Sequence, residues 1–198
     1  MTNQKITNMK EKEKENKKTD LSKYDNSWYN TGGSTLKRFI WYYINEWFIN
    51  CGWVFMSIVK VALLRAFGAK IGKGVCIKPH VNVKYPWNLT IGDYAWIGEN
   101  VWIDSLVPIH IGNNAVVSQG AMLLTGNHNY KSPSFDLIVK EITIEDGAWV
   151  GAQSTVCPGI TMKSHSVLTV GSIATKDCEA YCIYQGNPAV KIKDRIIE

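Results

Sequence analysis

The chain has 198 residues, of which 45% are hydrophobic and 20% are charged, and its formal net charge is +5. This composition is ordinary for a globular protein and excludes a chain that is disordered along its whole length. The excess positive charge forms no dense stretch of Arg and Lys that could follow a phosphate backbone, so we expect no nucleic-acid partner.

The cysteines indicate a reducing environment. They are five in number, and no two of them have Cys-x-x-Cys spacing (Cys51, Cys76, Cys157, Cys178, Cys182). No Cys or His pair has the spacing of zinc ligands either, so no metal site is predicted. Because no signal peptide precedes them, we expect reduced thiols in a cytoplasmic protein.

The first 20 residues form a charged segment without aromatic side chains. Lysine and glutamate alternate from Lys10 to Lys14, and little in the segment could pack against a core. Such a composition predicts a disordered tail over residues 1–20.

Residues 21–70 are rich in aromatic and aliphatic side chains, and four of the eight tryptophans lie here (Trp28, Trp41, Trp47, Trp53). The longest uncharged run, residues 47–59, is shorter than the roughly 20 residues that a membrane-spanning helix needs. Three interpretations remain open: a helical cap packed on the core, a helix lying in the membrane interface, and a tilted span. An interfacial helix would point Glu46 and Asn50 away from lipid, while nearby cations attracted anionic lipid (Lys37, Arg38, Lys60, Arg65).

From residue 71 to residue 185 the sequence repeats with a period of six. The stretches 91–103, 111–123 and 144–156 align by eye, with an aliphatic residue at every sixth position. A small residue follows four positions after most of these aliphatic residues (Ala95, Ala115, Ala121, Ala148, Ser154, Ser166, Ser172). A period of six fits neither a helix nor a simple strand, but it does fit short strands joined by tight corners. Three such units close a triangular coil, and stacked coils predict a mostly β fold, the parallel β-helix.

Glycine and asparagine at the corners are expected to supply the positive φ angles of tight turns (Gly92, Asn113, Asn114, Gly147). The repeat is interrupted after Val83, Ile103 and Leu123, and all three interruptions fall on the same corner of the triangle. Two of them insert two residues, whereas the third inserts a long loop over residues 125–141. A loop extruded from a rigid coil is where we expect function.

Several stretches outside and inside the repeat are similar to a known family. They are Tyr24–Tyr29, Leu64–Gly72, Lys84–Leu89, Leu124–Tyr130 and Gly186–Ala189. With them, the chain from about residue 21 to 193 resembles the left-handed β-helix acyltransferases of the hexapeptide-repeat type, and among these the colanic acid biosynthesis acetyltransferases. The resemblance implies the left hand of the coil, acetyl-CoA as the acyl donor, a sugar hydroxyl as the acceptor, and a homotrimer with active sites between subunits. Flat prism faces that can bury against copies of themselves are consistent with such a trimer. Residues 186–198 form a C-terminal extension.

The resemblance assigns the catalytic role to His128, in the Thr-Gly-x-His motif of the extruded loop. A sugar hydroxyl is a weak nucleophile, and imidazoles, with an ordinary pKa of about 6.5, suit the task of removing its proton. A carboxylate or carbonyl would orient the ring. Asp136 and Glu141 lie in the same loop, and the choice between them stays open.

Two sets of binding residues are expected, the first from the resemblance and the second from its place at the interrupted corner. Acetyl-CoA would lie along the late coils, with lysines pairing to its phosphates (Trp149, Gly151, Ala152, Val170, Gly171, Thr175, Lys176, Lys191). The family's Gly-Ala-Gly-Ser is replaced here by Thr169-Val-Gly-Ser172, which raises the question of crowding at Val170. The acceptor would lie near the interrupted corner, where aromatic and amide side chains could bind a sugar (Asn82, Tyr85, Trp87, Asn88, His110).

We therefore expect an acetyl-CoA-dependent O-acetyltransferase that modifies a sugar of an exopolysaccharide by direct transfer. The acceptor would be a sugar or a lipid-linked oligosaccharide, and the enzyme would be cytoplasmic, with attachment at the inner face of the membrane as the open alternative. Two other functions are compatible with the sequence. One is acetylation of a different small acceptor, a free sugar or serine, and the other is a non-catalytic hexapeptide scaffold.

Overall fold

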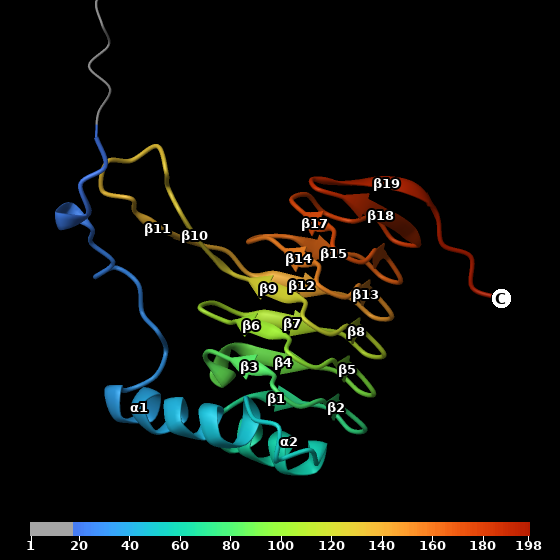
Figure 1. Ribbon diagram of the computed structural model, residues 1–198, viewed down its shortest axis with the longest axis horizontal. Helices are drawn as coiled ribbons and strands as arrows, with labels where there is room; N and C mark the ends of the chain where they lie inside the picture. Colours follow the sequence, from blue (N-terminus) through green and yellow to red (C-terminus); the bar gives the residue numbers. More distant parts are fainter. Residues whose placement is uncertain (1–17) are drawn as a thin grey trace, which may run out of the picture.

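The computed structural model describes residues 18–198, so most of the tail predicted over residues 1–20 lies outside the described residues. The described chain begins with a short 3₁₀ turn, η1 (Leu21–Lys23), followed by an irregular segment. Three helical elements come next: α1 (Thr35–Ile44), the π-helix η2 (Asn45–Ile49) and α2 (Ser57–Ala66). Every later strand belongs to a solenoid or to a hairpin that leaves it (Figure 1).

The solenoid has three sheets, in which all strands except the last one of the chain run parallel to one another. The first sheet contains β1 (Lys70–Ile71), β4 (Leu89–Ile91), β7 (Ile109–Ile111), β12 (Ile142–Ile144) and β15 (Thr161–Met162). The second contains β2 (Cys76–Ile77), β5 (Trp96–Ile97), β8 (Val116–Val117), β13 (Trp149–Val150), β16 (Val167–Leu168), β18 (Cys182–Gly186) and β19 (Ala189–Asp194). The third contains β3 (Asn82–Val83), β6 (Trp102–Asp104), β9 (Met122–Leu124), β14 (Thr155–Val156) and β17 (Ile173–Ala174). The chain visits the three sheets in turn, which confirms the predicted parallel β-helix.

The six-residue period sets the register between coils. Ile71 pairs with Ile91, and Ile91 pairs with Ile111, so equivalent aliphatic residues stack directly above one another. These side chains point into the prism and are almost completely buried. The small residues that follow them are buried as well, with Ala115, Ala121 and Ala148 all at 0% exposure. One continuous core therefore runs along the solenoid axis.

The corners obtain their tight turns in two ways. Asn114 and Gly147 have positive φ angles of 53° and 67°, as the sequence predicts. Gly92 and Asn113 do not. The role of Gly92 is a close approach between coils, because a Cβ atom there would lie 2.7 Å from the backbone nitrogen of Asn113. The positive angle of that corner falls instead on Tyr94, at 59°. A tight coil thus needs glycine for stacking as well as for turning.

The helical elements cap the first coils of the solenoid, where Figure 1 shows α1 and α2 across its lower end. Trp41 is 2% exposed, and its indole Nε1 donates to the carbonyl of Val83 at 2.9 Å. The Lys60 ammonium is fully buried and donates to the carbonyls of Ile49 and Lys78, at 3.0 and 2.9 Å. Arg65 donates to the carbonyl of Ile71. Within residues 18–198, no helix combines the length and the apolar character needed to cross a bilayer.

The long interruption after β9 forms an antiparallel hairpin of β10 (Gly126–His128) and β11 (Leu137–Val139). It leaves the solenoid at the corner between the third and first sheets, and residues 18–33 run beside it (Figure 1). The backbone N–H of Asp20 donates to the carbonyl of Pro133 at 2.7 Å, and the hydroxyl of Tyr29 donates to the carbonyl of Leu106 at 2.6 Å. The irregular N-terminal segment is thus tied to both the hairpin and the coil.

The C-terminal segment closes the other end of the prism. Residues 186–198, predicted as a C-terminal extension, contain β19, which pairs antiparallel with β18 at the edge of the second sheet. Tyr184 contributes a hydroxyl that accepts from the backbone N–H of Glu179 at 3.0 Å. This hairpin covers the last coil, which would otherwise expose its edge.

Candidate active site

His128 ends strand β10, and its ring is held by a residue of the opposite side of the hairpin. Its Nδ1 lies 2.9 Å from the carbonyl oxygen of Phe135, and the two rings stack with centroids 4.5 Å apart at 8°. A carbonyl can only accept, so Nδ1 carries the proton, and Nε2 of the neutral ring keeps its lone pair. Phe135 has a φ of 54°, a left-handed conformation that is unusual for a bulky residue. The hairpin backbone therefore sets the tautomer that a general base needs.

Neither carboxylate of the loop orients His128. Asp136 accepts a hydrogen bond from the hydroxyl of Ser134 at 2.6 Å, and its backbone carbonyl accepts from the N–H of Asn129. These side-chain hydrogen bonds lower the pKa of Asp136 below its ordinary range. Glu141 is exposed at the base of the hairpin. The group that orients the His128 ring is thus neither of the two carboxylates considered from the sequence but the backbone carbonyl of Phe135.

His128 faces a cavity of about 530 Å³, which we call the His128 cavity. Its walls come from three parts of the chain, namely the N-terminal segment, the interrupted corner and the hairpin. The lining residues are Tyr24, Asn26, Ser27, Tyr29, Thr31, Arg38, Lys84, Tyr85, Leu106, His128 and Leu137. The Tyr24 and His128 rings lie 5.9 Å apart. Burial raises the pKa of Tyr29, so its hydroxyl stays protonated and keeps its bond to Leu106.

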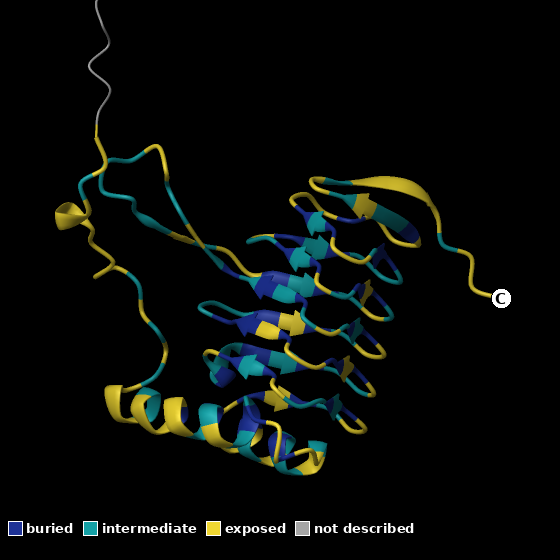
Figure 2. Cartoon of the chain, viewed as in Figure 1, coloured by how far each residue is buried: buried dark blue, intermediate teal, exposed yellow. Residues whose placement is uncertain are grey.

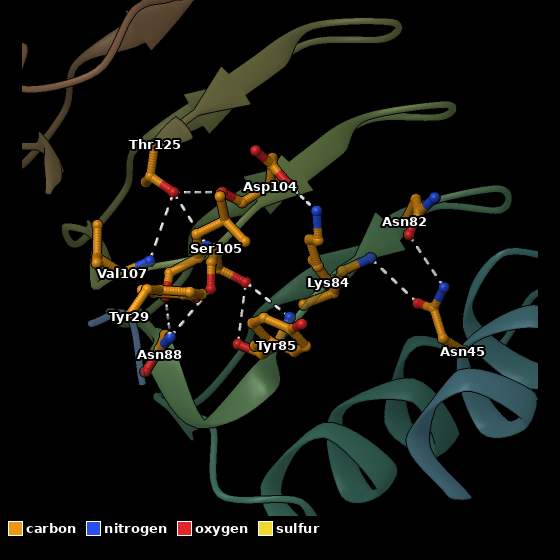
Figure 3. Close-up of polar contacts among 12 residues, drawn as sticks. Tyr29, Asn45, Asn82, Lys84, Tyr85, Asn88, Asp104, Ser105, Val107 and Thr125 are labelled. Carbon is orange, nitrogen blue, oxygen red and sulfur yellow. Dashed lines mark hydrogen bonds and ion pairs between the residues drawn. The ribbon is translucent and has the colours of Figure 1, made fainter. Parts of the chain in front are cut away.

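A second cavity of about 360 Å³, the helix cavity, lies between α1 and the third sheet. Its lining includes Arg38, Lys84 and Tyr85, which also line the His128 cavity. Figure 3 shows the ion pair of Lys84 and Asp104, 3.2 Å apart, between the Tyr85 corner and the contact of Asn45 with Asn82. The two cavities therefore share one wall.

The predicted acceptor residues separate into three groups. Tyr85 lines the His128 cavity, and Asn82 lines only the helix cavity, where it accepts from the amide of Asn45 at 3.0 Å. Trp87 and Asn88 hold the corner together. The Trp87 indole donates to the carbonyl of Thr31 at 2.6 Å, while the Asn88 amide donates to the carbonyls of Ser105 and Leu106. His110 lies on β7, exposed on the first sheet, and is not among the residues lining the His128 cavity.

The residues predicted for acetyl-CoA lie on the last coils, mostly around the second sheet. Trp149 on β13 is 45% exposed and donates to the hydroxyl of Ser118 at 2.8 Å. Gly151 and Ala152 form the corner between the second and third sheets, and the same corner one coil later carries Val170 and Gly171. Val170 is 70% exposed, so its side chain points into open space rather than crowding the coil.

The predicted lysine partners of the CoA phosphates differ in their surroundings. Thr175 and the exposed Lys176 follow β17, at the corner between the third and first sheets. Lys191 lies on β19 and already forms an ion pair with Asp194 at 2.7 Å, which raises the pKa of the lysine and lowers that of the aspartate. His128 and the Gly151 corner occupy different corners of the prism, so one chain does not bring all the predicted site residues together.

Sequence reasoning missed the N-terminal half of the cavity wall, which Tyr24, Tyr29 and Arg38 form with three smaller polar residues. No periodic pattern connects residues 24–38 with a loop a hundred positions later. The signal that was present is the stretch 24–29 itself, which resembles the acetyltransferase family although it lies outside the repeat. Within the described part of the chain, no three His, Cys, Asp or Glu side chains gather as metal ligands would.

Solved structures share this architecture. A hexapeptide-repeat-containing acetyltransferase from Vibrio cholerae superposes with a TM-score of 0.74 at 23% identity, covering 82% of this chain and 92% of that chain. A galactoside acetyltransferase in complex with coenzyme A superposes with a TM-score of 0.70 at 24% identity, covering 80% of each chain. The fold of this chain is therefore one that hexapeptide-repeat acetyltransferases share.

Sequence comparison narrows this class. The Escherichia coli K12 protein named "Putative colanic acid biosynthesis acetyltransferase WcaF" is 37% identical over 165 residues, covering 83% of this chain and 91% of that protein. The galactoside O-acetyltransferase of the same organism is 27% identical over 138 residues, 68% of each protein. A comparison with models of protein families matched none. The chain belongs to the family of WcaF-type hexapeptide-repeat acetyltransferases, and is an acyltransferase.

Proposed function

We propose that the protein transfers an acetyl group from acetyl-CoA directly to a sugar hydroxyl, with His128 as the general base. The observation that carries the proposal is the hydrogen bond from Nδ1 to the Phe135 carbonyl, which leaves the lone pair of Nε2 available beside a cavity. Nε2 removes the proton of the hydroxyl, whose oxygen attacks the thioester carbonyl. The tetrahedral adduct then collapses, the C–S bond breaks, and the proton passes from Nε2 to the departing sulfur. A backbone N–H of an adjoining coil would stabilise the oxyanion.

A covalent route through a cysteine is less well supported. Cys157 follows β14, and burial raises the pKa of its thiol, which disfavours the thiolate that nucleophilic attack needs. The four other cysteines are not among the residues that line the His128 cavity. Direct transfer with both substrates bound therefore accounts for the site with fewer assumptions.

We propose a homotrimer as the active assembly. Acetyl-CoA would contact Trp149, Gly151, Ala152, Val170 and Gly171 of one copy, with Thr175, Lys176 and Lys191 near its phosphates. Thr175 and Lys176 share with the His128 hairpin the corner between the third and first sheets, but most of these residues lie on the second sheet or at its corner with the third sheet. A neighbouring copy could bring its hairpin to this corner, and a closed threefold arrangement would repeat the contact three times.

The proposed acceptor is a sugar of an exopolysaccharide, as the name of the WcaF relative suggests, free or as part of a lipid-linked oligosaccharide. Tyr85 offers an aromatic surface in the cavity, and Asn82 offers an amide in the adjoining one. A free sugar or serine would be the acceptor in the alternative enzyme, and a scaffold would use none. The test is release of CoA from acetyl-CoA, measured with and without a panel of sugars and serine, together with product masses. Stimulated release with a sugar supports the proposal, whereas release unaffected by every acceptor contradicts it.

We also propose that the helical cap rests on the cytoplasmic face of the membrane. The helices α1, η2 and α2 and the segment between η2 and α2 expose a group of large apolar residues, which we call the aromatic face: Leu36, Phe39, Ile40, Tyr43, Trp47, Trp53, Phe55, Met56 and Ile58. Figure 2 shows much of α1 exposed on the side away from the solenoid. An apolar patch of this kind has a larger exposed area than single apolar residues scattered over a surface, and such patches mark interaction sites. Trp and Tyr rings favour the lipid headgroup region.

The cations expected to attract lipid have other partners in the structure. Lys60 and Arg65 donate to backbone carbonyls, and Lys37 lies 4.5 Å from the centre of the Trp87 ring. Burial of aromatic rings, rather than charge, would therefore supply most of the affinity, and salt should reduce binding only slightly. Asn50 is half-buried, and Glu46 lines the helix cavity instead of the aromatic face.

Vesicle co-sedimentation tests the membrane contact, with phosphatidylethanolamine and phosphatidylglycerol as the lipids. We expect the wild type to bind, the Trp47→Ala/Trp53→Ala double variant to bind at least tenfold more weakly, and a Trp96→Ala/Trp102→Ala control to bind like the wild type. Trp41 is left unchanged because it is buried. Negligible binding by all three proteins would contradict the proposal. Loss of the native mass in the Trp47→Ala/Trp53→Ala variant would also contradict it, because the aromatic face would then be a contact between copies of the chain.

A further inference from the structure

Arg38 occupies the first turn of α1 and faces the region where the two cavities meet. It is among the residues that line both the His128 cavity and the helix cavity. Its Nη2 donates to the hydroxyl of Thr35 at 3.2 Å, whereas its Nε is buried and has no hydrogen-bond partner. A buried N–H of a charged group without an acceptor is costly, so such a group is normally matched by a partner or a ligand.

The two cavities differ in the acidic residues that line them beside Arg38. Lys84 also lines both, but it already forms an ion pair with Asp104 at 3.2 Å. Glu46 lines the helix cavity and lies 3.4 Å from the amide of Asn45. Among the residues described, those lining the His128 cavity include Arg38 and Lys84 and no carboxylate. Within residues 18–198, Lys84 forms an ion pair with a carboxylate and Arg38 forms none, so the Arg38 guanidinium is the unpaired cation of that cavity.

We propose that the acceptor carries an anionic group, a carboxylate or a phosphate, that binds Arg38 while its hydroxyl reaches His128. The inference rests on the proposed acetyl transfer and adds the chemical class of the acceptor. A guanidinium binds carboxylate or phosphate through two parallel hydrogen bonds, which fixes orientation as well as position. The Lys84 side chain, 42% exposed and paired with Asp104, lies at the same wall. Cavities of several hundred cubic ångströms suit a charged monosaccharide, with the helix cavity receiving any further residue of a longer acceptor.

The test compares three acceptors that share one ring: methyl glucoside, methyl glucuronide and glucose 1-phosphate. We expect the wild type to acetylate one or both anionic acceptors with a kcat/KM at least tenfold above that of the neutral glucoside. Arg38→Gln should remove this preference by raising KM for the anionic acceptors, and should lower kcat/KM for them about 10- to 100-fold more than for the glucoside. The glucuronide and the phosphate distinguish the two anions.

Lys37→Gln is the matched control, because this neighbouring cation lies over the Trp87 ring and is not among the residues lining the His128 cavity. It should keep the wild-type preference. Calorimetric titration of the wild type and of Arg38→Gln with glucuronide and with glucose 1-phosphate, without acetyl-CoA, reports anion binding independently of transfer. Equal use of charged and neutral acceptors, or equal loss for both in Arg38→Gln, would overturn the inference. If no acceptor is acetylated, the proposed function fails, and the titration still shows whether Arg38 binds a carboxylate or phosphate group.

Discussion

Lys60 connects the helical cap to the solenoid, and replacing it with methionine should weaken this connection. Methionine keeps the length and most of the volume of the side chain, so no large cavity is left. The substitution removes two hydrogen bonds from a charged donor, to the carbonyls of Ile49 and Lys78. Each such bond contributes about 1.5–3 kcal/mol, and relief from burying the ammonium offsets part of the loss. We expect a net decrease of about 2 kcal/mol in the free energy of unfolding.

Urea denaturation at fixed protein concentration, followed by tryptophan fluorescence, measures this decrease, with Lys70→Met on the exposed side of β1 as the control. Burial lowers the pKa of Lys60 below its ordinary 10.5, so the folded protein releases this proton at a lower pH than the unfolded chain. Unfolding then takes up a proton, and the free energy of unfolding rises with pH between the lowered pKa and 10.5. The methionine variant should lack this contribution. A variant as stable as the wild type, or with an unchanged pH dependence, would refute the reasoning.

The remaining predictions concern the assembly and the hairpin. Light scattering should give three times the mass of one chain, and a monomer under dilute native conditions would contradict the composite site. Asp136→Asn and Glu141→Gln should each keep kcat within about threefold, since neither carboxylate contacts His128; a loss of a hundredfold in either would show that a carboxylate orients the ring after all. Deleting residues 1–17 should leave transfer unchanged, whereas deleting residues 1–33 removes Tyr24 and Tyr29 and should lower it at least tenfold with the assembly intact.

The fold was predictable because hexapeptide coils repeat one local rule. Each aliphatic residue, such as Ile91 or Ile111, must point inward, and a one-residue slip would expose it, so periodicity alone specifies the sheets and the interrupted corner. The individual turns were less predictable. Gly92 proved necessary for the approach of the next coil, while Tyr94 adopts the positive φ angle. Close stacking between coils is a property of the assembled solenoid, and a single hexapeptide does not contain it.

The site was predictable only where chemistry follows a motif. His128 could be singled out because it lies in an extruded loop and in a Thr-Gly-x-His motif that resembles the family's, but the Phe135 carbonyl that holds it is a backbone atom and leaves no side-chain signature. The packing of residues 24–38 against the hairpin depends on tertiary contacts, such as the bond between Asp20 and Pro133. The contacts of Lys60 and Arg65 also form only in the folded protein, so the sequence indicates surface cations although both side chains bind backbone carbonyls.

The central claim is that His128 acts as the base in acetyl transfer, and one comparison of variants tests it most directly. His128→Asn should bind acetyl-CoA with unchanged affinity by calorimetry and keep the native mass, while its transfer rate to a sugar that the wild type acetylates falls at least 100-fold. The control is His165→Asn, because His165 lies at a different corner with a φ of 58° that asparagine also tolerates, and it should retain full activity. Near-wild-type turnover by His128→Asn would contradict the account.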